Sequence, residues 1–207
     1  HYAAIRRPIM NAAQQDYVRK TVYIAPFTAL IPPNNQYNVT TVLAPTDDTH
    51  TAFHFIAWRE NGNIDQEAWR KFNVAQPGID VDGDFRTFRT RAHDYKQDRS
   101  AMKLGDFTGI RGIPNQDIAM WETMGPIADR TRERLGASDL AVVEFRRLMV
   151  DAARAFAERG EVLGRTEPHI PQATIASFEG MLPKGAPWQK AGRTVAPASS
   201  GQQDRVA

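Results

Sequence analysis

The stretch that decides the fold class is residues 37–58, YNVTTVLAPTDDTHTAFHFIAW. Its two ends, Tyr37–Ala44 and Thr51–Trp58, are rich in the β-branched and aromatic residues that favour strands. The connection Pro45–Thr49 is short and polar, so the pattern predicts an antiparallel hairpin. Both faces of the second segment are largely apolar, which predicts a strand that is covered on both sides.

The rest of the chain continues from strands to helices. Tyr17–Ile31 also predicts strand structure and is followed by turn residues, and Asp65–Phe72 predicts a short helix. A longer helix is expected from Pro114 to the Gly125-Pro126 pair. Strands that precede the helices indicate the α+β class.

The clearest element is a long helix that begins at Ser138 or Asp139 and ends before Gly160. Its apolar residues recur at helical spacing and predict a buried face. They are Val142, Phe145, Met149, Ala152 and Phe156.

Composition narrows the class of protein. An apolar fraction of 42% in 207 residues is enough for one globular core, and no apolar run is long enough to cross a membrane. The net charge is only +2, and the basic stretch Arg86–Lys103 is interleaved with acids, which favours a solvated face over a nucleic-acid groove. The absence of cysteine excludes a Cys-ligated iron–sulfur cluster in this chain. Residues 1–182 are expected to form the domain, and the composition of residues 183–207 predicts a flexible tail.

One carboxylate falls on an apolar helical stripe. Asp117 lies three, four and seven residues before Met120, Trp121 and Met124, which places all four side chains on one helix face. A buried carboxylate must pair, protonate or bind a cation. An aspartate in an early turn can also be an exposed acid that the helix dipole favours, and the pattern leaves both interpretations open.

Other candidate motifs are weaker. His50 and His54 are four residues apart, but in a strand that spacing separates them by about 13 Å, too far to share one ion. The glycines 105, 109 and 112 lack the strand–helix context of a phosphate loop. Phe27, Phe53 and Phe55 are typical of a core, and some could line an aromatic pocket instead.

Several separated motifs occur in a characteristic order. They are Asp94–Arg99, Phe107–Ile113, Gln116–Glu122, Met124–Ile127 and Leu135–Asp139. Together they closely resemble the C-terminal half of the oxygenase component of phthalate-dioxygenase-like Rieske proteins. Within these, the chain looks nearest the branch that contains the O-demethylases of lignin-derived biaryls. The resemblance covers about residues 1–182.

The resemblance implies a START-like helix-grip fold, in which a curved antiparallel sheet packs on a long C-terminal helix; the chain would hold part of that domain. It also implies a mononuclear Fe(II) held by two histidines and one carboxylate. The matching Gln-Asp-x-x-x-x-Glu motif is Gln116, Asp117 and Glu122, so Asp117 is the implied iron ligand. Phe27 and Thr41 resemble strand positions that line the substrate pocket.

The histidine pair and the Cys/His motifs of the family's Rieske domain match nothing in this sequence. We therefore expect a C-terminal fragment, or a protein completed by a separate chain.

The implied parent enzyme is a terminal oxygenase that uses O₂ to hydroxylate or O-demethylate an aromatic substrate, expected to be an acid. Electrons would come from NAD(P)H through a reductase and a [2Fe–2S] cluster in the part not matched here. The family implies a cytoplasmic homotrimer without nucleic-acid or membrane partners. Two other interpretations stay open: a non-catalytic START-like module that binds an aromatic or other hydrophobic ligand, and a remnant gene product with no function alone.

Overall fold

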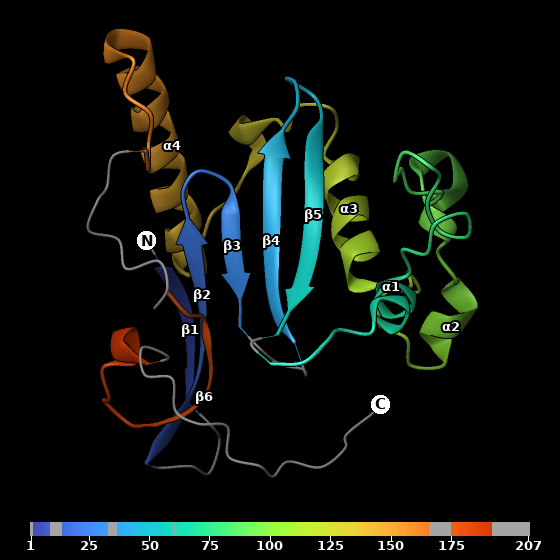
Figure 1. Cartoon of the computed structure of the whole chain (residues 1–207), viewed down its shortest axis with the longest axis horizontal. Helices are drawn as coiled ribbons and strands as arrows, with labels where there is room; N and C mark the ends of the chain where they lie inside the picture. The colour runs from blue at the N-terminus through green and yellow to red at the C-terminus, as the bar shows by residue number, and fades with distance from the viewer. Residues whose placement is uncertain (1, 9–13, 33–36, 60, 166–174, 192–207) are drawn as a thin grey trace. The chain divides into compact units, whose positions relative to one another are not determined.

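The computed structural model of the chain describes residues 2–8, 14–32, 37–59, 61–165 and 175–191. The chain divides into two compact units, residues 1–34 with 149–207 and residues 35–148, and each is described by itself. The predicted α+β class is confirmed. Antiparallel strands come first along the chain, and the 20-residue helix α4 (Leu140–Arg159) follows them (Figure 1).

The first unit is built around the strand β2 (Gln15–Ile24). Along one edge it pairs antiparallel with β1 (Tyr2–Pro8). Its other edge is shared, because β3 (Thr28–Ile31) pairs with the last residues of β2 and β6 (Phe178–Pro183) pairs with the first. The central position explains why Val18 of β2 is only 1% exposed.

Polar side chains are also buried on β2. Asp16 and Lys20 lie on either side of Val18 on the same face of the strand, and all three are buried. The Lys20 ammonium group donates a hydrogen bond to the carbonyl of Ala191, which holds the segment after β6 against the sheet. This bond satisfies one donor of a charged group that burial alone would strongly disfavour.

The segment that follows β6 is ordered as far as it is described. The Lys184 N–H donates to the Gln14 carbonyl at 2.8 Å, and a single 3₁₀ turn, η5, spans Trp188–Lys190. Residues 192–207 lie outside the described residues, so the flexible tail over 183–207 stays a prediction.

The C-terminal half of α4 belongs to the first unit. The Tyr23 hydroxyl of β2 donates to the Met149 sulfur at 3.4 Å, a direct contact between sheet and helix. Gly160 adopts φ +68° and its N–H bonds to the Phe156 carbonyl, so the helix ends where the sequence predicts.

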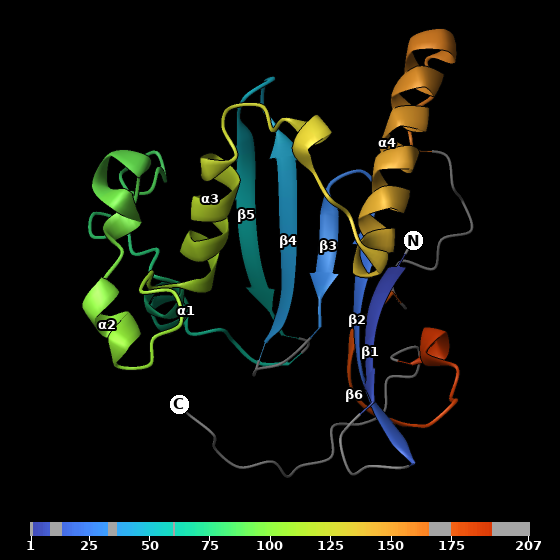
Figure 2. The same cartoon turned by 180° about the vertical axis from the view of Figure 1, so that it is seen from behind.

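The second unit begins with the predicted hairpin, which is confirmed. β4 (Asn38–Pro45) and β5 (Thr51–Trp58) pair antiparallel over their whole length. The short helix α1 (Gln66–Asn73) follows, and the side chain of Asp65 caps it by accepting the Ala68 N–H at 2.9 Å. The helix α3 (Ile113–Thr123) lies beside β5, and α1 lies next to its N-terminal end, as both views show (Figures 1 and 2).

Short helical segments fill the rest of this unit. They are η1 (Arg91–Lys96), α2 (Arg99–Lys103), η2 (Arg130–Arg132) and η3 (Ala137–Asp139). Within η1, Asp94, Tyr95 and Lys96 all have positive φ angles of 45–53°, a costly conformation for residues other than glycine. It places the Tyr95 ring in a buried cluster with Ile110 and Ala119.

The predicted burial of the long helix is wrong. No described residue of α4 is buried, and Val142, Phe145 and Phe156 are 39%, 42% and 61% exposed. The helical spacing is as predicted, but the described residues leave the apolar face of α4 uncovered. Among the described residues, no helix has the length and apolar character that a membrane crossing requires.

Candidate functional site

The candidate ligand Asp117 is carried by α3, whose bounds follow from local sequence. Gly112 precedes the helix with φ +84°, and Pro114 occupies the first turn, where its missing N–H is tolerated. Gly125, with φ +92°, follows the last turn. Four of the helix's residues, 114–117, therefore lie close to its N-terminus.

The two faces of α3 differ in a way that the sequence did not reveal. Asn115 and Ala119 are 6% and 1% exposed and form the buried face. At about 100° per residue, the stripe of Asp117, Met120, Trp121 and Met124 lies on the opposite face. The three apolar members of that stripe are 39–60% exposed. None of these three apolar side chains is buried in this chain.

Asp117 itself is exposed. Among the described residues its carboxylate has no hydrogen bond or ion pair. Partial burial nevertheless raises the pKa of Asp117 above its ordinary value. The carboxylate is thus an unpaired group on an apolar, accessible face.

The other two residues of the Gln-Asp-x-x-x-x-Glu motif, Gln116 and Glu122, have neighbours within the second unit. The Gln116 side chain donates to the Ile110 carbonyl at 2.8 Å. Burial raises the pKa of Tyr95, and the neighbouring Glu122 carboxylate raises it further. The Tyr95 hydroxyl is buried without a well-formed hydrogen bond to any described residue. Gln116 therefore anchors the helix, and Glu122 lies near Tyr95.

A chain of aromatic rings supports the same region. Trp69 of α1 stacks on Phe55 of β5 with 5.4 Å between ring centroids, and Phe53 meets Trp121 of α3 edge-on at 5.2 Å. Phe53 and Phe55 are themselves 6.0 Å apart, and Tyr37 packs edge-on against Trp69 at 5.8 Å. These rings join α1 and α3 to the hairpin, as predicted for Phe53 and Phe55 as packing residues.

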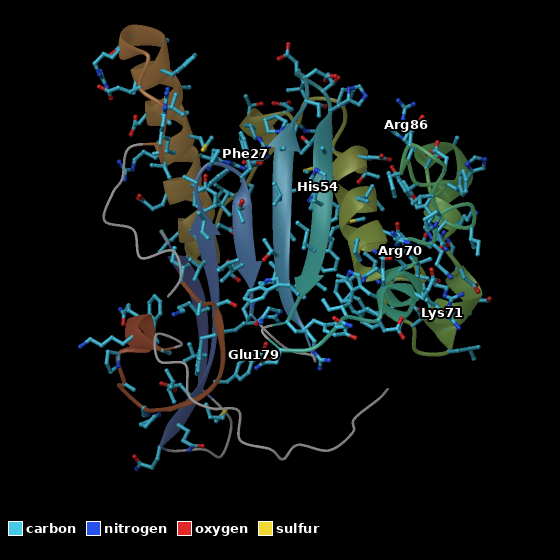
Figure 3. All side chains as sticks on the ribbon, in the orientation of Figure 1. Phe27, His54, Arg70, Lys71, Arg86 and Glu179 are labelled. Carbon is cyan, nitrogen blue, oxygen red and sulfur yellow. The ribbon has the colours of Figure 1, made fainter. Side chains whose placement is uncertain are left out.

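The two candidate substrate contacts lie in different units. Phe27 is 36% exposed and lies in the turn between β2 and β3 (Figure 3), so its placement on a strand was wrong. Thr41 is half-buried on β4, opposite Phe55 in the hairpin. Their contact with a substrate stays a prediction.

Two histidines belong to the hairpin. His50 lies at the hairpin turn with Nδ1 2.9 Å from Asp47, and His54 lies on β5 (Figure 3). In the described ranges, no three His, Cys, Asp or Glu side chains gather as a metal site would require. Asp117 fits as one oxygen ligand of an iron site, but the described residues supply no complete ligand set.

A surface hollow occurs elsewhere, at the C-terminal end of α4. It is lined by Ala152, Ala155 and residues 160–165 of the first unit. None of the predicted site residues lines it, and we assign it no role in the candidate site.

Asn115, Trp69 and Tyr95 were missed by the sequence analysis. The sequence did contain an indication of where Asn115 lies. Two residues along a helix correspond to about 200°, so Asn115 must lie on the face opposite Asp117. The left-handed backbone of Tyr95 had no signal in the sequence.

Comparisons with known proteins bear on the same region. Residues 1–204 match the family described as LigXa C-terminal domain like. The chain is 58% identical over 189 residues to the phthalate 4,5-dioxygenase oxygenase subunit of Pseudomonas putida, covering 91% of the chain and 43% of that protein. It is 31% identical over 200 residues to the 3-chlorobenzoate-3,4-dioxygenase oxygenase subunit of Comamonas testosteroni, covering 86% of the chain and 45% of that protein. The chain therefore spans less than half the length of these relatives.

Proposed function

Because the chain belongs to the LigXa C-terminal domain-like family, we propose that it forms the C-terminal part of the catalytic domain of a Rieske-type aromatic oxygenase. Its relatives are oxygenase subunits whose names give phthalate and 3-chlorobenzoate, both aromatic acids. The proposed reaction is O₂-dependent hydroxylation or O-demethylation of an aromatic acid. A biaryl O-demethylase is the narrower form of this proposal.

The observation that carries the proposal is the state of Asp117. An unpaired carboxylate whose pKa is raised by partial burial lies on an accessible apolar face, opposite the buried residues Asn115 and Ala119. With no partner among the described residues, the oxygens of this carboxylate are free to bind a metal ion. A metal ligand needs a free oxygen and a fixed backbone, and a carboxylate with two histidines is the usual triad for non-heme Fe(II).

Iron held in this way would supply the O₂-activating chemistry. The share of this chain would be one anionic ligand from Asp117, with aromatic and apolar side chains around it to exclude water. Met120, Trp121 and Met124 share its helix face. Thr41 and Phe27 are the proposed substrate contacts.

The other components of the system are also proposals. The [2Fe–2S] cluster would lie in the part of the subunit that this chain does not span, since the chain has no cysteine. The histidine pair would also lie there, because no pair in this sequence matches that of the family. Electrons would come from NAD(P)H through a separate reductase. The assembled oxygenase would be a cytoplasmic homotrimer.

The test uses Asp117→Asn and Asp117→Ala in the complete oxygenase subunit. We expect both variants to lose the mononuclear iron and all turnover, while the visible spectrum of the Rieske cluster stays unchanged. Asp65→Asn is the matched control, because it makes the same chemical change at a helix cap where asparagine serves equally well. Full iron content in Asp117→Asn, equal to that of the control, would refute the assignment.

A further inference from the structure

The amide of Asn115 joins two helices of the second unit. Its side chain is buried and its Nδ2 donates to the carbonyls of Val74 at 3.2 Å and Arg111 at 3.1 Å, with Asn73 O more distant at 3.5 Å. Val74 caps the C-terminus of α1 in a left-handed conformation. The last carbonyls of a helix have no partner within it, so Asn115 supplies what α1 lacks.

Gly112 makes this approach possible. A Cβ at this position would lie 2.6 Å from the Asn73 carbonyl oxygen and 2.9 Å from the Asn115 Nδ2. Its φ of +84° is likewise a conformation that side-chain-bearing residues rarely adopt. The start of α3 therefore packs on the end of α1 only because residue 112 has no side chain.

The joint at Asn115 closes a ring of contacts. α1 is held to β5 through Trp69 and Phe55, and the far end of α3 is held to the same strand through Trp121 and Phe53. α3 is thus fixed at two points along its length. Asp117 lies between them, about 200° around the helix axis from Asn115.

We propose that Asn115 is a positioning residue, which fixes the rotation and height of α3 so that the Asp117 carboxylate is held where an iron ligand must be. This inference rests on the proposed function. Metal sites need their ligands within about 0.5 Å of the binding geometry, and a side chain on a helix is only as well placed as the helix. Asn115 does not touch Asp117 and acts through the backbone that both share.

The first experiment measures amide hydrogen exchange in the full chain without metal. Asn115→Ser is the most informative variant, because serine can still reach the Arg111 carbonyl four residues earlier but cannot reach Val74. We expect exchange across the end of α1 and the start of α3 to become about tenfold faster. Gly112→Ala should give the same pattern without removing any hydrogen-bonding group. Val81→Ala, a buried change elsewhere in this unit, should leave that segment unchanged.

The second experiment measures Fe(II) affinity in the complete subunit by anaerobic titration. We expect Asn115→Ser and Gly112→Ala to raise the Kd about tenfold, with an unaltered Rieske spectrum. Val81→Ala should leave the Kd unchanged even where it lowers the melting temperature equally.

Three results separate the possible failures. Unchanged exchange at α3 in Asn115→Ser would overturn the joint itself. Faster exchange with an unchanged Kd, while Asp117→Ala loses iron, would overturn the positioning role and leave the proposed function standing. Normal iron binding by Asp117→Ala would overturn the proposed function and this inference with it.

Discussion

The packing of Trp121 on Phe53 can be tested by a double-mutant cycle. Each ring is replaced by leucine, singly and together, and the free energy of unfolding of all four proteins is measured by denaturant titration. The rings meet edge-on with centroids 5.2 Å apart and an interplanar angle of 85°, a geometry that contributes about 0.5–1.5 kcal/mol beyond area burial. Trp121 is 39% exposed, so we expect a coupling energy in the lower half of that range, about 0.5–1 kcal/mol.

The control cycle pairs Trp121 with Phe85, which is 72% exposed and has no ring contact with Trp121 in the described structure. Those two changes should add within about 0.3–0.5 kcal/mol. A Phe53–Trp121 coupling no larger than the control would mean that α3 does not rest on β5. The helix that carries Asp117 would then be held only at its N-terminal end, by Asn115.

Three further predictions concern stability. Val18→Ala removes two methyl groups at a position 1% exposed and should destabilise the chain by about 2–3 kcal/mol, whereas a loss below about 0.5 kcal/mol would contradict the central place of β2. Phe145→Ala should lower the free energy of unfolding by about 1–2 kcal/mol, roughly half the value for a fully buried ring, because Phe145 is 42% exposed. Hydrogen bonds from Arg146 and Arg130 lower the pKa of Glu133 to about 2 from its ordinary 4.5, so its stabilisation is full above pH 4.5 and fades as the pH falls toward 2. The stability difference between wild type and Glu133→Gln should shrink over that range, and a constant difference would show that these ion pairs do not stabilise the fold.

Local patterns predicted those elements whose determinants lie close together in the sequence. The hairpin, α1, α3 and α4 were found because alternation, caps and helical spacing are properties of neighbouring residues. β6 was missed because its pairing with β2 joins residues more than 150 positions apart, such as Lys20 and Phe178. β1 was also missed, although its partners in β2 lie only 8 to 20 positions away, from Pro8 with Asp16 to Tyr2 with Val22.

The apolar stripe that carries Asp117 could be identified from helical spacing, but the spacing does not show whether that face is buried or exposed. In this chain the buried face carries Asn115 and Ala119. The Asn115 amide can be buried because it donates a hydrogen bond to a carbonyl at the end of α1 that would otherwise lack a partner. Hydropathy alone cannot predict that such an amide is buried, because its hydrogen-bond partner at the end of α1 is distant in the sequence.

The uncovered apolar face of α4 also determines how the chain should behave in a test tube. Leu140, Val143 and Phe156 add to a surface on which no described side chain of the helix is buried. A net charge of +2 gives little mutual repulsion between molecules. The chain prepared by itself should therefore bind a hydrophobic dye and self-associate as its concentration rises. Salt should promote this association, because it screens the weak repulsion between molecules. Charged substitutions along α4 offer a direct route to a preparation that stays dispersed at the concentrations that structural work requires.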